Sequence, residues 1–407
     1  MKKIVVSFLV LALLTSFSGC NNPKDSQSGS TENTAAQSEE IQANAESDFE
    51  YQITDDGNIT VIKYIGKDTS VVIPDTIQGK KVTSIGKGDK MVFGDDYQTS
   101  DIVSVHIPDT VTSIGAFAFQ ACKKLETVIL SQNLKKIGLG AFTSCASLKQ
   151  ITIPASVESW DDFAFSKCIR LETVNLSDGL KQLGSFAFEH CISLKNISIP
   201  SSIHSIPFSA FSECTGLETV QFPDTLSEIG DSAFQGCTSL KSVLIPSSVR
   251  NINSLVFCNS GLETVTFEEG IEIIDGSKAF ASTQLKQLVL PSTVKKIGAS
   301  VFSENSELES VILNEGLIEI QPYAFSKCTK LKEIVIPKSV ESIKDVTFQM
   351  CIGLEKIMFE GDAPDTFKFL VIDKFDDTYG ANFTVYHHET ATGFTSPQWY
   401  GYPTQIW

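Results

Sequence analysis

Apolar and polar residues alternate over short stretches that recur along the whole chain. In one such stretch Leu125, Val128 and Leu130 occupy positions that would face inward. Thr127 and Ile129 occupy the positions between them and would face outward. An alternation with a period of two predicts a short β-strand with one buried face. The pattern returns about every 23 residues, so successive strands can stack in parallel and in register, about 4.8 Å apart.

Each repeating unit also carries one phenylalanine, usually preceded by alanine, in the segment opposite the strand. The spacing is 23 residues except for one step of 22 residues, which ends at Phe302. We expect this segment to form a short helical or 3₁₀ turn on the wall opposite the strands. About 11 full repeats would then build a rod on the order of 55 Å long. The phenylalanines are Phe119, Phe142, Phe165, Phe188, Phe211, Phe234, Phe257, Phe280, Phe302, Phe325 and Phe348.

A second period is visible in the residue that follows the leading leucine of each strand, where glutamate and lysine alternate without a break. Like charges stacked on neighbouring parallel strands would repel, and alternation converts each repulsion into an attraction. The underlying unit is therefore a pair of coils, 46 residues long. A charge-based binding groove is the alternative, but the row is nearly neutral. The row is Glu126, Lys149, Glu172, Lys195, Glu218, Lys241, Glu263, Lys286, Glu309, Lys332 and Glu355.

The repeating template reads L-x-x-V-x-I-P-x-x-V-x-x-I-G-x-x-A-F-x-x-C, which is that of a leucine-rich repeat. It closely resembles the BspA-type subclass of bacterial surface proteins over about residues 105 to 360. The resemblance implies a leucine-rich-repeat solenoid, mainly β, with a cap at each end. It also implies a surface adhesion or recognition role without catalysis.

The N-terminus has the features of an export signal. Two lysines precede an apolar run from Ile4 to Leu14 that is too short to span a bilayer as a mature helix. Residues 17–20 resemble the lipobox of bacterial lipoproteins, which implies cleavage before Cys20 and lipid attachment to it. An ordinary secretory signal cut nearby is the alternative. We therefore expect an extracytoplasmic protein that is anchored to the bacterial membrane by lipid on Cys20.

Changes in composition divide the chain into five predicted regions. After the signal, a stretch rich in Ser, Asn, Gln and Glu has little to bury and predicts a disordered tether. The regions are a signal peptide (1–19), the lipidated cysteine with its tether (20–48), an N-terminal cap with a degenerate repeat (49–106), the repeat solenoid (107–360) and a C-terminal cap (361–407). Within the N-terminal cap, residues 55–58 predict a hairpin turn.

The charge and the chemical side chains argue against several classes of function. The chain carries 32 basic and 49 acidic residues, a net charge of −17, which disfavours nucleic acid as a partner. Its histidines fit no catalytic spacing, and no P-loop, G-x-S-x-G or H-E-x-x-H motif is present. We predict no enzymatic activity, no cofactor and no metal.

Eight cysteines occupy one slot of the repeat, three residues after the phenylalanine. Stacked coils would bring neighbouring slots within disulfide range. However, the slot also accepts Ser260, Thr283 and Asn305, and a uniform row of thiols specifies no pairing. Neither zinc spacing nor basic surroundings for a reactive thiolate are present. We therefore predict buried, unpaired cysteines that pack as small apolar residues. They are Cys122, Cys145, Cys168, Cys191, Cys214, Cys237, Cys328 and Cys351.

One outward-facing strand position starts with Ile129, is polar through the early middle of the repeats and is apolar over the last four. Contiguous exposed apolar surface usually marks an interaction site. We therefore predict that Val289, Ile312, Val335 and Met358, with Leu244 earlier in the same row, bind a protein partner from the host or the envelope. The strand preference of β-branched residues is the alternative explanation. We expect a monomer, and a structural component of the envelope is the second functional class.

Four aromatic residues near the C-terminus, Trp399, Tyr400, Tyr402 and Trp407, allow two interpretations. They could form a platform on which a sugar stacks. A solenoid, however, ends in an open apolar coil that needs covering. We favour a cap over a carbohydrate site.

Overall fold

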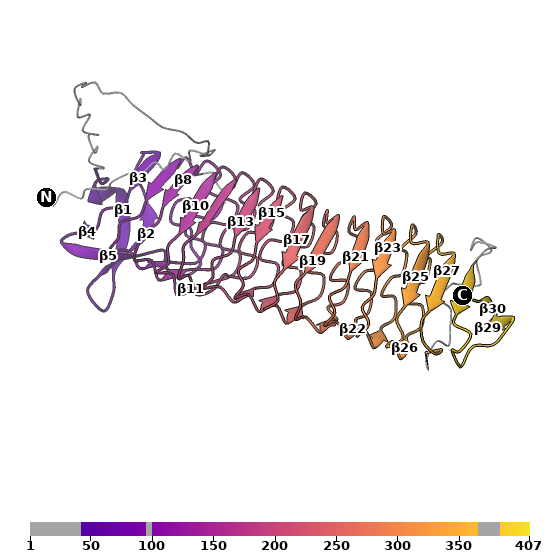
Figure 1. Cartoon of the computed structure of the whole chain (residues 1–407). Coiled ribbons are helices and arrows are strands. Elements are labelled where there is room, and N and C mark those ends of the chain that lie inside the picture. The colour runs from indigo at the N-terminus through magenta and orange to yellow at the C-terminus, as the bar shows by residue number, and fades with distance from the viewer. Residues whose placement is uncertain (1–41, 95–99, 365–382) are drawn as a thin grey trace, which may run out of the picture.

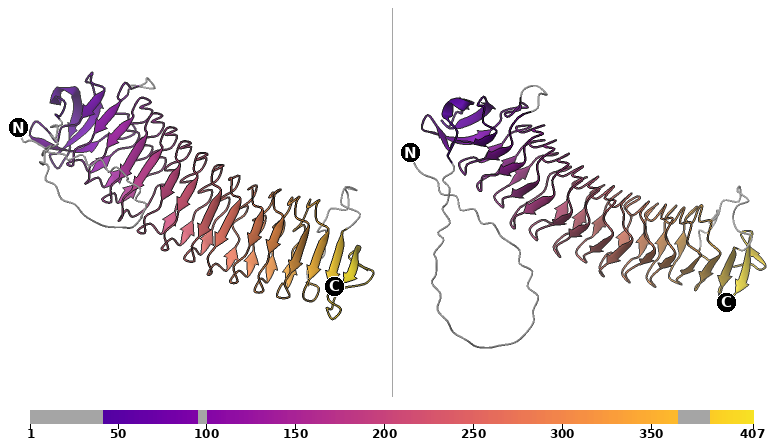
Figure 2. Two further views of the ribbon diagram at one scale, coloured as in Figure 1. Left: turned by 45° about the horizontal axis from the view of Figure 1, so that its top comes forward. Right: turned by 90° about the horizontal axis from the view of Figure 1, so that it is seen from above.

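The computed structural model describes residues 42–94, 100–364 and 383–407. These residues form a long, gently bent solenoid in which the chain winds through one coil about every 23 residues (Figures 1 and 2). The strands of one wall line the upper side of Figure 1, and a second row of very short strands lines the lower side. The N- and C-terminal ends of the rod lie at opposite ends of the molecule. The prediction of a mainly β solenoid with parallel strands in register is confirmed.

The first wall consists of parallel strands of three or four residues, which we call the strand wall. Residues with equivalent positions in the repeat face one another, as in the pairs Gln150–Thr173 and Ile153–Leu176. The strands are β3 (Ser70–Val72), β6 (Ser104–His106), β8 (Thr127–Ile129), β10 (Gln150–Ile153), β12 (Thr173–Leu176), β13 (Asn196–Ser198), β15 (Thr219–Gln221), β17 (Ser242–Ile245), β19 (Thr264–Phe267), β21 (Gln287–Val289), β23 (Ser310–Ile312), β25 (Glu333–Ile336) and β27 (Lys356–Phe359).

The second wall is a ladder of two-residue strands, which the sequence did not indicate. Each ends in an inward apolar residue, which is isoleucine in every strand but β11. The strands pair in parallel, as Lys136–Ser159 and Ile137–Trp160 do, within three groups that end at β11, β18 and β26. The strands are β7 (Ser113–Ile114), β9 (Lys136–Ile137), β11 (Ser159–Trp160), β14 (Ser205–Ile206), β16 (Glu228–Ile229), β18 (Asn251–Ile252), β20 (Ile273–Ile274), β22 (Lys296–Ile297), β24 (Glu319–Ile320) and β26 (Ser342–Ile343).

The third wall, which holds the alanine-phenylalanine segments, contains turns and no helix in the described repeats, so the expected helical or 3₁₀ turns there were wrong. In every one of the eleven repeats the residues two before and two after the phenylalanine have positive φ. This geometry turns alternate amides toward the next coil: Phe163, Phe165 and Lys167 donate to the carbonyls of Ser185, Ala187 and Glu189 at 2.7–2.9 Å. A helix would satisfy these amides within its own turn and could not join one coil to the next.

The core of the rod is a column of phenylalanine rings. The rings from Phe93 to Phe348 stack in sequence with centroids 4.6–5.7 Å apart and interplanar angles of 2–19°. The eleven repeat phenylalanines from Phe119 to Phe348 are completely buried. Because one ring contacts the ring of the next coil, the column makes the core continuous along the rod.

The coils of the strand wall are associated in pairs, in agreement with the 46-residue period. Within each pair, the strand of the lysine-bearing coil matches the next, glutamate-bearing strand over three or four residues. Between pairs, β8 and β10 bridge only at Thr127 and Gln150, and β12 and β13 only at Thr173 and Asn196. Farther along, β15 and β17, β19 and β21, and β23 and β25 lie in separate sheets. We call these weakly paired positions seams.

Proline accompanies the seams, although Pro223 also follows β15, a glutamate-bearing strand that pairs with β13 over three residues. Every lysine-bearing strand is followed by proline, which has no amide hydrogen. At the equivalent place after three of the glutamate-bearing strands, the amides of Ser177, Glu268 and Glu360 donate back across the pair at 3.0–3.1 Å. The proline cannot donate to the preceding coil in this way, so the ladder opens there. The prolines are Pro154, Pro200, Pro246, Pro291 and Pro337.

Both ends of the chain extend the solenoid beyond the repeats. At the N-terminus, the 3₁₀ helix η1 (Glu46–Asp48) leads into an antiparallel hairpin with the predicted turn at residues 54–58, and β3 already continues the strand wall. At the C-terminus, β28 pairs with β27 in register over four residues. The terminal elements are β1 (Phe49–Ile53), β2 (Ile59–Tyr64), β4 (Thr76–Ile77), β5 (Lys80–Ile85), β28 (Thr384–His387), β29 (Gln398–Trp399) and β30 (Tyr402–Ile406).

Candidate functional site

The apolar row predicted from the sequence lies on the outer face of the strand wall. Leu244, Val289 and Ile312 have exposed fractions of 52%, 54% and 60%, and Val335 and Met358 are half-buried. Val289 lies beside Ile312, and Val335 beside Met358, on paired strands. Thr266 separates Leu244 from the other four. We call these five residues, Leu244, Val289, Ile312, Val335 and Met358, the apolar strip.

The strip continues beyond the residues that the sequence analysis identified. β28 places Tyr386 beside Met358 on the same face, and the tyrosine is half-buried. The repeat template ends before Tyr386, and therefore periodicity gave no reason to include it. The exposed apolar surface thus runs to the last coils of the solenoid.

In the N-terminal half of the strand wall the same row begins with Val72, His106 and Ile129 and is then polar over four coils. Thr152, Asn175, Ser198 and Gln221 are all exposed. The Asn175 amide donates to the Thr152 hydroxyl at 3.3 Å, so a polar side chain here joins one coil to the next. An exposed valine or isoleucine can contribute no such bond. The apolar strip is therefore a property of the C-terminal half of this wall.

One flank of the strip is acidic. The turns that follow the strands in the C-terminal half carry Glu268, Glu269, Glu315, Glu360 and Asp362, which we call the acidic edge. The bases beside it are Lys338, Arg250, which donates to the Gly270 carbonyl at 2.8 Å, and His388, which acts on Glu360. Glu268 and Glu360 lie two residues beyond Thr266 and Met358, and therefore face outward like the strip, about 6.6 Å along the strand. The opposite flank carries charges of both signs, including the Lys356–Glu333 pair at 3.6 Å.

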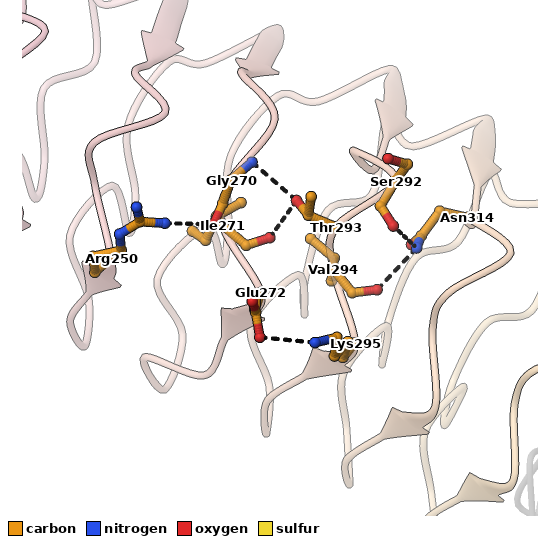
Figure 3. A network of polar contacts seen from close by, with 9 residues as sticks. All are labelled: Arg250, Gly270, Ile271, Glu272, Ser292, Thr293, Val294, Lys295 and Asn314. Atoms are coloured by element: carbon orange, nitrogen blue, oxygen red, sulfur yellow. Dashed lines mark hydrogen bonds and ion pairs between the residues drawn. The ribbon is translucent and has the colours of Figure 1, made fainter.

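Hydrogen bonds between coils fix the backbone of the acidic edge (Figure 3). The Gly270 amide donates to Thr293 Oγ1 at 3.0 Å, and this hydroxyl donates to the Ile271 carbonyl at 2.8 Å. Asn314 Nδ2 donates to the carbonyls of Ser292 and Val294 at 3.0 and 2.9 Å. Each turn thus holds the next in place, and the carboxylates project from a defined backbone.

The carboxylates of the edge differ in their partners. Glu269 accepts hydrogen bonds from the amide and hydroxyl of Ser292 at 3.1 and 2.9 Å, which lowers its pKa. Glu360 behaves in the opposite way: a hydrogen bond with Glu315 and partial burial raise its pKa, although Lys338 acts against this.

The alternating charge row on the strand wall forms ion pairs, as expected. Lys149 pairs with Glu126 at 2.7 Å and Lys195 with Glu218 at 3.2 Å. Glu263 lies between two lysines, 2.7 Å from Lys286 and 3.7 Å from Lys241. All of these groups are exposed, and pairs of this kind contribute little stability individually.

The cysteine slots form a buried row of unpaired thiols, as predicted, and the structure adds a polar contact that the sequence did not indicate. All nine cysteines in the described part of the chain are free and buried. In the eight slot cysteines, each thiol donates to the carbonyl of the phenylalanine one coil earlier at 3.0–3.4 Å. Burial raises the pKa of Cys122 and of Cys214 to about 12. Such thiols have almost no thiolate at neutral pH, which fits packing and not nucleophilic chemistry.

Other candidate chemistry finds no support among the described residues. No group of three His, Cys, Asp or Glu side chains there is arranged to hold a metal ion. A cavity of about 740 Å³ beside the N-terminal hairpin is lined by lysines and carboxylates together, including Lys87 and Asp89. No helix in the described ranges has the length and hydropathy to cross a membrane. Cys20 lies outside the described residues, so its lipidation stays a prediction.

The C-terminal aromatic cluster is divided between burial and exposure. Trp399 and Tyr402 have exposed fractions of only 4% and 8%. Trp399 packs against the rings of Phe359 and Phe394, which agrees with a cap over the last coils. Tyr400 and Trp407 remain about half exposed. A continuous stacking platform made of all four rings is therefore not present.

The repeat, the parallel strand wall and the phenylalanine column define a leucine-rich-repeat solenoid of bacterial type. The sequence profile described as the BspA type leucine rich repeat region matches residues 94–217, 161–277 and 274–369, in six copies. These matches cover more than half of the chain, and the chain belongs to this family.

Two solved structures illustrate the likeness. A leucine-rich repeat protein from Bacteroides ovatus is 25% identical, with a TM-score of 0.62 over 88% of this chain and 98% of that one. A leucine rich cell surface protein from Faecalibacterium prausnitzii is 26% identical, with a TM-score of 0.52 over 90% and 99% of the two chains. A comparison with proteins of curated function gave no match.

Proposed function

We propose that this chain is a non-catalytic, lipid-anchored protein of the bacterial surface that binds a protein partner through the apolar strip. The observation that carries the proposal is the exposure of Leu244, Val289 and Ile312 in a row that is polar from Thr152 to Gln221. Their cross-strand contacts contribute only modestly to the isolated rod, whereas burial of their apolar surface by a partner would favour binding.

The family and the sequence supply the remaining support. Leucine-rich-repeat solenoids bind through extended faces, while their cores repeat. The Faecalibacterium prausnitzii relative is described as a cell surface protein, in agreement with an export signal and a lipobox that ends at Cys20. The tether that follows would give the rod a reach of roughly 30 Å from the membrane.

Site-specific photo-crosslinking on intact cells tests the proposal. A photoreactive residue at Ile312 should give a discrete protein adduct, whereas the same residue at Gln221, in the polar half of the same row, should give none. Unlabelled protein should compete with the adduct, and an Ile312→Ser competitor should fail to do so. Equal crosslinking at both positions, or none at Ile312, would contradict binding through the strip.

The anchor is tested separately from the partner. Labelling with a radioactive fatty acid should mark the wild type, and the Cys20→Ala variant should be unlabelled and released from the membrane fraction. If the Cys20→Ala variant is still cut near the same place and released, while the wild type carries no label, the ordinary secretory signal is the correct interpretation.

A further inference from the structure

The surroundings of the apolar strip are electrically asymmetric, and this constrains what can cover it. Along the turn side runs the acidic edge, whose five carboxylates outnumber the bases beside it, Lys338, Arg250 and His388. Along the other side, Glu263 and Lys286 pair at 2.7 Å, and Glu333 and Lys356 pair at 3.6 Å, so charge is nearly balanced. A partner that covers the strip therefore meets negative potential on one side only.

The acidic edge also contains a like-charge contact that the rod itself does not relieve completely. The neighbouring Glu315 carboxyl group raises the pKa of Glu360, and Lys338 and His388 act against this. Two carboxylates in contact cannot both ionise freely, and a cation placed between them removes the conflict. Basic side chains of a partner would supply that cation.

The spacing of the strip selects the shape of the partner. Neighbouring strands are about 4.8 Å apart, and the phenylalanine rings of the same coils are 5.5–5.7 Å apart. An α-helix laid along the rod presents one residue per turn, about every 5.4 Å. An extended strand presents same-face residues about every 6.7 Å. From Val289 to Met358 the rod advances by three coils. Over that length the contact residues of a helix fall out of step with the strip by about 2 Å in total, and those of an extended strand by about 6 Å.

We infer that the apolar strip is a docking surface for a cationic amphipathic α-helix that lies along the rod axis. One apolar side chain per helical turn contacts Val289, Ile312, Val335 and Met358 in succession, and lysine or arginine on one flank of the helix faces Glu315 and Glu360. This inference rests on the proposed protein-binding function and names the class of partner.

Binding of synthetic helices to the purified full-length protein tests the inference. The first probe is a fluorescent peptide of about 18 residues, or five turns, with leucine on one face and lysine on the rest. The second replaces every lysine with glutamate. The third keeps the leucine and lysine composition in an order that is not amphipathic. In fluorescence anisotropy the first probe should bind at least about tenfold more tightly than the other two.

Paired variants assign the binding to the two parts of the surface. Ile312→Ser should weaken binding of the cationic helix by about tenfold or more, whereas Ile192→Ser, at an exposed isoleucine outside the strip, should not. The double variant Glu315→Gln/Glu360→Gln should weaken it several-fold and reduce its salt dependence. Asp178→Asn/Asp224→Asn, on the corresponding turns of the N-terminal half, should leave it unchanged. All four variants alter exposed or half-exposed side chains, and circular dichroism verifies that they fold.

Each contrary result overturns the inference. Equal binding of the lysine and glutamate probes would show that charge does not select the partner. Equal binding of the third probe, whose order is not amphipathic, would show that the partner need not be an amphipathic helix. Concentration-dependent self-association that Ile312→Ser abolishes would make a second copy the occupant. If no probe binds while Ile312 still crosslinks to a protein on cells, the proposed function stands and this inference fails. If Ile312 does not crosslink either, both fail.

Discussion

The N- and C-terminal halves of the strand wall share one repeat and one core but differ in how their strands and outer faces are arranged. In the N-terminal half, seven strands from β3 to β15 form a continuous sheet with a largely polar outward row. In the C-terminal half, β17 with β19 and β21 with β23 form separate two-stranded sheets, β25 and β27 join the terminal strands in a five-stranded sheet, and the row carries the apolar strip. The seams have opened where the outer face has become apolar.

The comparison shows that the core and the outer face of this solenoid can change independently. The phenylalanine column crosses from one half to the other without interruption, at 5.3–5.6 Å between Phe211, Phe234 and Phe257. The core therefore does not depend on a continuous strand ladder, and outward positions are free to become a binding surface. Solenoids are stabilised by each coil's contacts with its neighbours, which permits this division of roles.

The largest expected effect tests whether the phenylalanine column is packed equally tightly in the two halves. Phe165→Ala in the N-terminal half and Phe302→Ala in the C-terminal half should each reduce the free energy of unfolding by about 3–5 kcal/mol, because both rings are fully buried between two others. Urea unfolding followed by circular dichroism measures this. A loss at Phe302 of less than half that at Phe165 would show that the C-terminal half is loosely packed.

The second prediction concerns the place where the thiol row changes into an amide network. Asn305 Nδ2 donates to the carbonyls of Phe280 and Phe302 at 2.9 Å each, and its Oδ1 accepts from Thr283. Asn305→Ala should cost about 2 kcal/mol or more, because buried polar groups lose their partners. Cys168→Ala in the N-terminal half removes only a weak sulfur donor and should cost about 1 kcal/mol.

Unfolding free energies of the two single variants measure this difference directly. Asn305→Cys combined with Thr283→Cys provides the matched control, since it restores the thiol row through both coils and should recover most of the loss. If Asn305→Ala costs no more than Cys168→Ala, the amide network contributes nothing beyond the thiols that it replaces.

The sequence predicted the features that have a period and missed those that depend on backbone conformation. The strand wall, the phenylalanine row and the paired coils follow from residues that recur at fixed spacing. The left-handed residues of the third wall do not, because only Gly140 and Gly236 among them are glycines. Residues such as Phe163 and Lys167 carry no local sign of positive φ, which only the bonds between coils impose.

The candidate site was predictable to a similar degree. Alternation alone placed Val289 and Ile312 outward, where they are exposed. The acidic edge could have been found from the glutamates in the turns, but its relation to the strip requires knowing that Glu360 faces the same way as Met358. Tyr386 could not be found by periodicity, because eighteen residues (365–382) outside the described ranges separate its strand from the last repeat.

A third prediction addresses the seams themselves. Pro337→Ala supplies an amide that can donate to the Leu313 carbonyl and close the seam between β23 and β25. The gain of one hydrogen bond and the loss of proline's rigidity should nearly cancel, leaving stability within about 1 kcal/mol of the wild type. Hydrogen exchange by NMR should nevertheless show a protected amide at position 337. Pro154→Ala is the matched change in the N-terminal half, and rapid exchange at both new amides would refute proline as the cause of the seams.

The smallest expected effect comes from the charge row, in which Glu263 of the C-terminal half has two lysine partners and Glu126 of the N-terminal half has one. Glu263 lies near Lys241 and Lys286, and its pKa is lowered, chiefly by the hydrogen bond from Lys286. Because the pKa is lowered in the folded state, the Glu263 carboxylate stabilises the fold at neutral pH. This stabilisation is lost as the pH falls through the lowered pKa. Glu263→Gln should therefore destabilise the protein slightly at neutral pH and not at all near pH 2, well below the ordinary pKa of glutamate (about 4.3).

Glu126→Gln, which removes a carboxylate paired with Lys149, should have the smaller effect of the two in thermal unfolding at low salt. A difference between Glu263→Gln and the wild type that persists unchanged at the acidic pH would show that the residue acts through packing and not through its charge.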